Sequence, residues 1–237
     1  MRKLAIFMEG QTELIFVKKL VYVLGDNANV AIQEERVRGG RRGRTPRVVE
    51  MIGTNEPEGH EFFVLLIDCG QDERAKSDIL DRYHGLVAVN YEQILAVRDV
   101  YPHSHGDVEA IREGFTFRLP NDPIQPFLIL AIMEIEAWFL AEYSHFLRIH
   151  PDLTAKRIKH EFGFDVVNDD MQLRNHPSKD LEDIYFLETL FYHKTREHVE
   201  QTVNSLDFSE IRDRLATQIT DLGELIRLIQ SFFAERQ

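Results

Sequence analysis

Apolar residues form short continuous runs in the first 150 residues. Such runs occupy 3–8, 62–68 and 127–133, and a mixed segment at 29–37 also suits a strand. Continuous apolar runs of this length are typical of strands that are buried on both faces of a parallel sheet. We therefore predict that these four segments form the sheet.

Stripes with apolar residues spaced by three and four separate these runs and predict helices. The expected helices are 12–24, 73–84, 91–98, 107–113 and 135–148. A further helix is expected to open at 47–52, and a further strand is expected at 86–89. Alternating strands and helices favour an α/β fold, in which helices cover a parallel sheet.

Strand signals nearly vanish after Pro151. Segments 154–162 and 179–203 are predicted to be helical, and the stripe over 209–234 predicts one long amphipathic helix. We therefore expect an α/β core over 1–150 and a helical extension packed on it over 151–237. The stripe repeats close to every seven residues, so packing in the chain's own core and homo-oligomerisation or docking on a partner both stay open.

The composition is that of a globular protein, with 43% hydrophobic and 29% charged residues. No run of about 18 uncharged apolar residues occurs, so we expect no membrane-spanning helix. The apolar run after Arg2 and Lys3 is too short for a secretory signal. Cys69 is the single cysteine, which rules out an intramolecular disulfide. These features predict a cytoplasmic protein.

The net charge of −12 disfavours a protein that coats nucleic acid non-specifically, because neutralising phosphates needs basic residues. The segment RVRGGRRGRTPR is nevertheless basic. Its arginines are Arg36, Arg38, Arg41, Arg42, Arg44 and Arg47. Arginine donates paired hydrogen bonds to phosphate, so this segment is predicted to bind the backbone of a nucleic acid. The alternative is a solvated loop, or one that pairs with the protein's own acidic surface.

Acidic residues follow three of the predicted strands. They are Glu9 and Glu13 after the first run, Asp68 and Asp72 after the run at 62–68, and Glu134 and Glu136 after the run at 127–133. Because the carboxyl ends of parallel strands share one edge of a sheet, we expect these carboxylates to converge. Their hard oxygen donors suit Mg²⁺ or Mn²⁺ better than zinc. Helix capping is the alternative for any single one of them.

The string IFMEGQTELIFVKKLV resembles the first motif of Toprim domains, especially those of OLD-type and related defence nucleases. In that motif a strand ends in Glu-Gly and is followed by Thr-Glu and a helix, which Glu9-Gly10 and Thr12-Glu13 match. FFVLLIDCG occupies the place of the family's Asp-x-Asp motif. MEIEAW at 133–138 and HPSKDL at 176–181 resemble later segments of an uncharacterised Toprim-like branch.

The resemblance implies a compact sheet with helices on both faces and Mg²⁺-dependent phosphodiester chemistry. It implies that Glu9 is a general acid/base or metal ligand and that Asp68 binds the metal. The family's second aspartate is replaced by Gly70, so Asp72 would have to reach the metal through a different turn. The resemblance also implies a role in defence against phage or plasmids, beside an ATPase partner.

Three functions fit these patterns. The first is an endonuclease that cuts DNA or RNA with Mg²⁺ or Mn²⁺. The second is a Toprim scaffold that has lost its chemistry through Gly70 and acts as a regulatory or partner-binding module, which the acidic charge favours. The third is a phosphoryl-transfer enzyme that acts on a small nucleotide or polyphosphate. The sequence leaves the substrate open.

Overall fold

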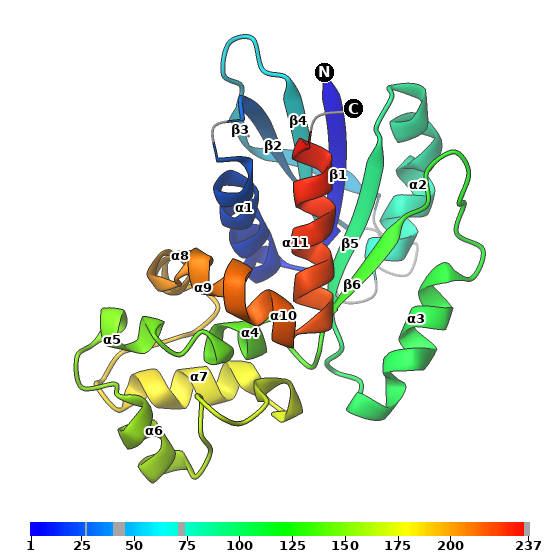
Figure 1. Cartoon of the computed structure of the whole chain (residues 1–237). Coiled ribbons are helices and arrows are strands. Elements are labelled where there is room, and N and C mark those ends of the chain that lie inside the picture. The colour runs from blue at the N-terminus through cyan, green and yellow to red at the C-terminus, as the bar shows by residue number, and fades with distance from the viewer. Residues whose placement is uncertain (27, 40–45, 71–73, 235–237) are drawn as a thin grey trace. The chain divides into compact units, whose positions relative to one another are not determined.

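The computed structural model describes residues 1–26, 28–39, 46–70 and 74–234. Over these residues the chain forms a six-stranded sheet of order β3-β2-β4-β1-β5-β6 (Figure 1). The strands are β1 (Arg2–Met8), β2 (Val30–Arg38), β3 (Val48–Asn55), β4 (Phe62–Asp68), β5 (Gln93–Asp99) and β6 (Phe127–Ala131). β1 is parallel to β4 and β5, β2 is parallel to β4, and β3 is antiparallel to β2. The predicted α/β fold is confirmed, with an antiparallel strand at one edge.

Helices account for most of the remaining described residues. They are α1 (Gln11–Gly25), α2 (Arg74–Ala88), α3 (Val108–Thr116), α4 (Glu136–Ala141), α5 (His145–Ile149), α6 (Ala155–Phe162), α7 (Pro177–Phe186), α8 (Arg196–Ser205), α9 (Phe208–Glu210), α10 (Ala216–Gln218) and α11 (Thr220–Phe233). Short 3₁₀ turns occur at His105–Asp107 and Met171–Leu173, and a π-helical turn spans Ile211–Leu215. Within the described ranges, no helix has the length and apolar character needed to cross a membrane.

The chain forms two compact units whose segments alternate along the sequence. Unit 1 contains Met1–Arg98, Ala110–Ile129 and Leu225–Gln237, and unit 2 contains Asp99–Glu109 and Leu130–Glu224. Unit 1 holds most of the sheet, whereas unit 2 is almost entirely helical. The division into domains at residue 150 stays a prediction.

Helices cover both faces of the sheet in unit 1. The chain leaves β1 toward β2 on one side and leaves β4 toward β5 on the other. Because such crossovers are right-handed, the two connecting helices, α1 and α2, lie on opposite faces (Figure 1). Ala5 and Phe7 of β1 share a buried cluster with Ile79 and Tyr83 of α2. The prediction that both faces are covered is therefore confirmed.

Two predictions near the sheet are wrong. Segment 48–55 is strand β3, not a helix beginning at 47, because it pairs along its length with β2. The second error concerns 86–98, where α2 continues to Ala88 and the strand is Gln93–Asp99. The short apolar run Ile94–Val97 fits either a buried helix or a strand, and its pairing with β1 decides the outcome.

Three helices predicted toward the C-terminal side are also interrupted. Segment 135–148 divides into α4 and α5, segment 179–203 divides into α7 and α8, and segment 209–234 divides at Ile219, whose backbone is extended. Gly223 lies so close to the preceding turn that a Cβ there would be 2.3 Å from the carbonyl oxygen of Ala216. A break does not disturb the apolar stripe, because residues on both sides of it are buried. The stripe alone therefore cannot reveal it.

Candidate functional site

Two candidate carboxylates lie at adjacent strand ends in unit 1. Met8 and Asp68 are register partners at the ends of β1 and β4, and Glu9 directly follows Met8. The chain leaves these two strands in opposite directions, so a crevice opens between their ends. Ligands of open α/β sheets bind in such crevices. The fold therefore brings Glu9 and Asp68 to the place where chemistry is expected.

A cavity of about 480 Å³ lies at these strand ends. Its lining residues are Glu9, Gly10, Gln11, Arg36, Val37, Arg38, Gly39, Asp68, Gly70 and Arg74. Glu9 is only 5% exposed and Asp68 only 3% exposed. The cavity therefore combines buried carboxylates, which suit a cation, with arginines, which suit an anion.

Each of these two carboxylates is paired with an arginine. The Nε of Arg36 donates to Oδ2 of Asp68 at 2.7 Å, and the backbone N–H of Gly70 donates to Oδ1 at 2.8 Å. The Nε of Arg98 lies 3.4 Å from Oε1 of Glu9. These contacts balance much of the negative charge and fix the orientation of Asp68.

Glu13 is a third buried carboxylate close to this cavity. It lies in the first turn of α1, where the positive end of the helix dipole favours an acidic side chain. Its Oε2 is 3.1 Å from the position that a Cβ on Gly10 would take. Glycine at position 10 thus lets the Glu13 side chain lie against the turn that follows β1.

The structure explains why a glycine stands at position 70. Gly70 has a φ of +72°, and a Cβ at this position would lie 2.8 Å from the carbonyl oxygen of Val37. An aspartate side chain does not fit this backbone without a shift of Val37. Position 70 instead contributes its N–H to Asp68. Asp72, which would have to replace the second aspartate, lies outside the described residues.

Gly70→Asp, which restores the Asp-x-Asp spacing, is expected to lower the free energy of unfolding by roughly 2–3 kcal/mol and not to tighten Mg²⁺ binding. The reasons are the strained positive φ and the clash with backbone. Gly59→Asp is the matched control, because Gly59 has a φ of +68° with nothing within 4 Å. Urea unfolding and a Mg²⁺ titration test this. Equal losses in both variants, or tighter Mg²⁺ binding by the Gly70 variant, would contradict it.

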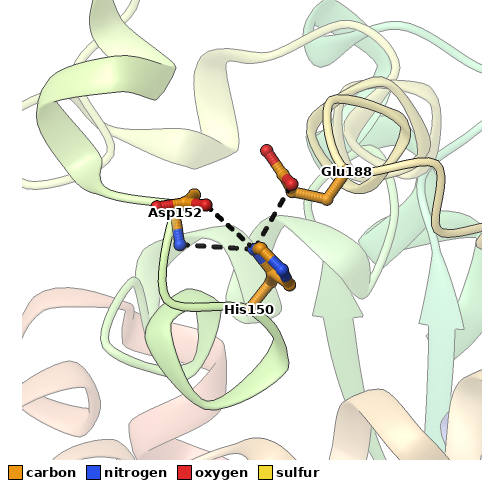
Figure 2. Close-up of side chains that lie close together, drawn as sticks. All are labelled: His150, Asp152 and Glu188. Atoms are coloured by element: carbon orange, nitrogen blue, oxygen red, sulfur yellow. Dashed lines mark hydrogen bonds and ion pairs between the residues drawn. The ribbon is translucent and has the colours of Figure 1, made fainter.

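The predicted acidic residues do not form a preformed three-ligand group among the described residues. There, the group whose ligand atoms all lie within 4.8 Å of one another is His150, Asp152 and Glu188 (Figure 2). Glu9 and Asp68 are instead paired with separate arginines. A metal at these carboxylates would therefore require rearrangement of their side chains or an additional ligand.

Arg157 already supplies a cation to the group of His150, Asp152 and Glu188 (Figure 2). Nδ1 of His150 lies 3.5 Å from Oε2 of Glu188 and 3.9 Å from Oδ2 of Asp152. Arg157 pairs with Oε1 of Glu188 and donates to the backbone oxygen of Asp152. Nδ1 of His150 also accepts from the backbone N–H of Asp152 at 3.3 Å. Arg157 and the backbone N–H of Asp152 therefore hold this surface group together without a metal.

Glu134 and Glu136 belong to unit 2 and share one lysine. Nζ of Lys194 lies 3.0 Å from Oε1 of Glu134 and 3.1 Å from Oε1 of Glu136. Glu134 also accepts from the N–H and Oγ of Ser178, each at 2.8 Å, and so caps the start of α7. Glu136 accepts from the hydroxyl of Tyr192 at 2.8 Å. The ammonium bridges the two carboxylates, as a metal ion would.

The charges of this lysine-centred group follow from its burial and contacts. Burial raises the pKa of Glu136, which is fully buried. Burial also acts to raise the pKa of Glu134, but Lys194 and the Ser178 hydrogen bonds outweigh it and hold that pKa below its ordinary value. Burial acts to lower the pKa of Lys194, yet Glu136, Glu134 and Asp99 raise it well above its ordinary value. Lys194 therefore remains an ammonium at any physiological pH.

The arginine-rich segment has more than one role. Arg36 and Arg38 line the cavity, and Arg38 also pairs with Glu50. Arg47 instead pairs with Asp78 and Asp81 of α2, as the alternative of pairing with the protein's own acidic surface predicts. The other predicted phosphate ligands, Arg41, Arg42 and Arg44, lie outside the described residues.

Sequence reasoning missed three cations at the predicted sites. Arg74 lines the cavity from α2, Arg98 pairs with Glu9 from β5, and Lys194 bridges the carboxylates of unit 2. Arg74 has an acidic residue four positions later, Asp78, and so resembles an ordinary surface pair on a helix. No motif pointed to Lys194 itself. The motif HPSKDL at 176–181 pointed only to Ser178, which donates to Glu134, one of the two carboxylates that Lys194 bridges.

Comparisons with known proteins name no function. No protein-family model matches the chain, and no curated protein matches it at a significant level. A solved structure that is similar to this chain is that of a hypothetical protein from Pyrococcus horikoshii OT3. The two are 18% identical, the alignment covers 99% of this chain and 100% of that one, and the TM-score is 0.45. The relationship to Toprim domains stays a prediction.

Proposed function

We propose that this protein is a Mg²⁺-dependent nuclease that hydrolyses phosphodiester bonds in DNA or RNA at the ends of β1 and β4. The observation that carries the proposal is the cavity that combines the buried carboxylates of Glu9 and Asp68 with Arg36, Arg38 and Arg74. A phosphodiester substrate needs both kinds of group, because a cation must meet its oxygens and donors must hold its charge.

The carboxylates fit Mg²⁺ or Mn²⁺ by their chemistry. Glu9 and Asp68 offer hard oxygen donors, and both are almost fully buried. When bound there, the ion would supply a Lewis acid that activates water and stabilises charge on a phosphoryl oxygen. The N–H of Gly70 holds one oxygen of Asp68 in place, so the chain itself orients this ligand.

The arginines fit the phosphate. Arg74 is anchored by a hydrogen bond of 2.7 Å to the backbone oxygen of Gly39, so its guanidinium is held at the cavity wall. Arg38 is mostly exposed and stands at the rim. A fixed arginine inside and an exposed arginine outside suit a chain of phosphates that passes through the opening.

The ion pairs of Glu9 and Asp68 favour a second candidate function, a regulatory or partner-binding module without catalysis. Arg98 and Arg36 already neutralise these carboxylates, and the described residues contain no three-carboxylate group there. Its predicted property is partner association without a metal requirement. A role in phage defence beside an ATPase partner, for either function, rests on the resemblance to Toprim proteins alone.

The decisive test uses plasmid DNA, single-stranded DNA and RNA with Mg²⁺, Mn²⁺ or EDTA. Asp68→Asn and Glu9→Gln are each expected to reduce cleavage by about 10²-fold or more, because each removes a charged ligand and keeps its shape. Asp81→Asn is the matched control, since Asp81 is exposed and pairs with Arg47 away from the cavity. Cutting in EDTA, or full cutting by both site variants, would reject the nuclease. Absence of cutting with every substrate would favour the module.

A further inference from the structure

Arg36 and Asp68 form an ion pair in which one partner can leave and the other cannot. They are register partners on β2 and β4, so their side chains start from neighbouring backbone positions. The Asp68 side chain is 4% exposed, whereas that of Arg36 is 26% exposed. The second contact of Arg36, from Nη2 to Oε1 of Gln11, is long at 3.4 Å. Arg36 therefore has the freedom to move into the cavity that it lines.

A divalent ion and Arg36 compete for the same oxygen. Arg36 donates to Oδ2 of Asp68, while Oδ1 is taken by the N–H of Gly70. An ion on Oδ2 would stand where the guanidinium now stands, and the two positive charges would repel. Metal binding at Oδ2 therefore favours release of Asp68 by Arg36.

A released Arg36 has an obvious new partner in a phosphate group. Arg38 and Arg74 line the same cavity, so three guanidinium groups surround it. Nη2 of Arg74 is buried and makes no hydrogen bond within the described residues, although it lies 3.9 Å from a carboxylate oxygen of Asp78. Nη1 of Arg74 donates to the backbone oxygen of Gly39, another lining residue, so an anion in the cavity would meet Arg38 and Arg74 beside the released Arg36.

We propose that Arg36 changes partners with the state of the site. It neutralises Asp68 in the metal-free protein, and when a divalent ion takes Asp68 it turns to bind a phosphate group of the substrate. This inference rests on the proposed function and adds the order of its binding steps. Metal binding then raises phosphate affinity, and by linkage phosphate raises metal affinity to the same degree.

Calorimetric titration with MnCl₂ alone tests whether Arg36 competes with the divalent ion for Asp68. Arg36→Gln is expected to bind Mn²⁺ about tenfold more tightly than the wild-type protein, because the ion no longer displaces a charge-assisted hydrogen bond. Arg38→Gln is the matched control. It removes the same charge from the same cavity, but Arg38 pairs with Glu50 and not with a candidate metal ligand. Its Mn²⁺ affinity should change by much less. Arg36→Lys keeps the charge and should show an intermediate gain, which guards against misfolding of the glutamine variant.

Equilibrium dialysis of radiolabelled inorganic phosphate, with and without Mn²⁺, tests whether the released Arg36 binds phosphate. Mn²⁺ should raise the phosphate affinity of the wild-type protein about tenfold, and this gain should vanish in Arg36→Gln but persist in Arg38→Gln. Mn²⁺ binding that needs Asp68 but is equal in wild type and Arg36→Gln would overturn the inference and leave the proposed nuclease intact. Absence of Mn²⁺ binding in every variant would overturn both.

Discussion

Replacement of Lys194 with methionine is expected to lower the free energy of unfolding by about 2–4 kcal/mol at neutral pH. Methionine keeps the length of the side chain but leaves Glu136, which is fully buried, and Glu134 without their shared cation. Removing one partner of a buried ion pair costs about 3–5 kcal/mol. We expect a loss near and below the lower end of that range because the Lys194 side chain is 41% exposed, so water screens the charge that is lost.

Urea unfolding of three variants checks this result. Lys194→Met combined with Glu136→Gln should regain much of the lost stability, since the second change removes the fully buried carboxylate. Lys179→Met is the matched control, because Lys179 also contacts two carboxylates, Glu182 and Asp183, but on an exposed helix surface. It should lose much less stability than Lys194→Met, because water screens exposed ion pairs. Equal losses in the Lys194 and Lys179 variants would show that burial of the Glu134–Glu136 pair has no energetic consequence.

The Lys194 variant also tests whether Glu134 and Glu136 can hold a metal. Without the ammonium, the two like charges raise each other's pKa, and a raised carboxyl pKa gives stability that is lost as the pH rises. The variant should therefore recover stability on acidification. If the carboxylates can bind a divalent ion, Mg²⁺ should stabilise Lys194→Met at neutral pH more than it stabilises the wild-type protein. Recovery with acid but not with Mg²⁺ would mark the pair as structural.

The sequence reveals the acidic half of the candidate site better than the basic half. Glu9 and Asp68 could be located because each follows a continuous apolar run, and such runs predict buried parallel strands with a shared edge. Arg98, which pairs with Glu9, and Arg74, which lines the cavity, could not be located, because they come from β5 and α2 and no pattern in the sequence links them to these strand ends. Only the strand order and the register between β2 and β4 bring Arg36, and not another arginine of its segment, to Asp68.

The errors in the fold have a related cause. Segment 48–55 is a strand because β2 offers it a partner, and its own residues are largely exposed. Local periodicity cannot report a partner that lies elsewhere in the chain. The break at Ile219 was equally hidden, because two successive helices that each bury an apolar face can show the same stripe as one continuous helix. Periodicity thus predicts which residues are buried more reliably than which elements bury them.

A second large effect is expected at His145 of unit 2, which should cause acid destabilisation of the protein. Its ring is fully buried and contacts Phe146 and Tyr185. The pKa of His145 is lowered from 6.5 to about 4, chiefly by burial and to a smaller extent by the charge of Arg148, while the hydrogen bond to the backbone oxygen of Glu142 opposes them. Nδ1 lies 2.6 Å from that oxygen, so it carries the hydrogen and donates.

The sign of the pH effect follows from these values. A histidine whose pKa falls on folding binds its proton more tightly in the unfolded chain, so protonation favours unfolding. Its contribution to stability is complete above pH 6.5 and is lost as the pH falls toward 4. Since each pKa unit corresponds to about 1.4 kcal/mol, the loss reaches about 3 kcal/mol. The neighbouring Glu142 has the opposite effect on stability. Burial raises its pKa, so its protonation at low pH favours the folded state.

Comparison of His145→Phe with the wild-type protein isolates this effect. Phenylalanine keeps an aromatic ring beside Phe146 but cannot be protonated, and it loses the hydrogen bond to Glu142. The variant should be about 1 kcal/mol less stable at pH 7.5, and should gain about 3 kcal/mol relative to wild type between pH 6.5 and 4, so that the two stability curves cross. Glu142→Gln should keep the acid loss, since it retains His145. Parallel curves for wild type and His145→Phe would assign acid destabilisation to other groups, because only a buried neutral histidine gives a difference that grows over this pH range.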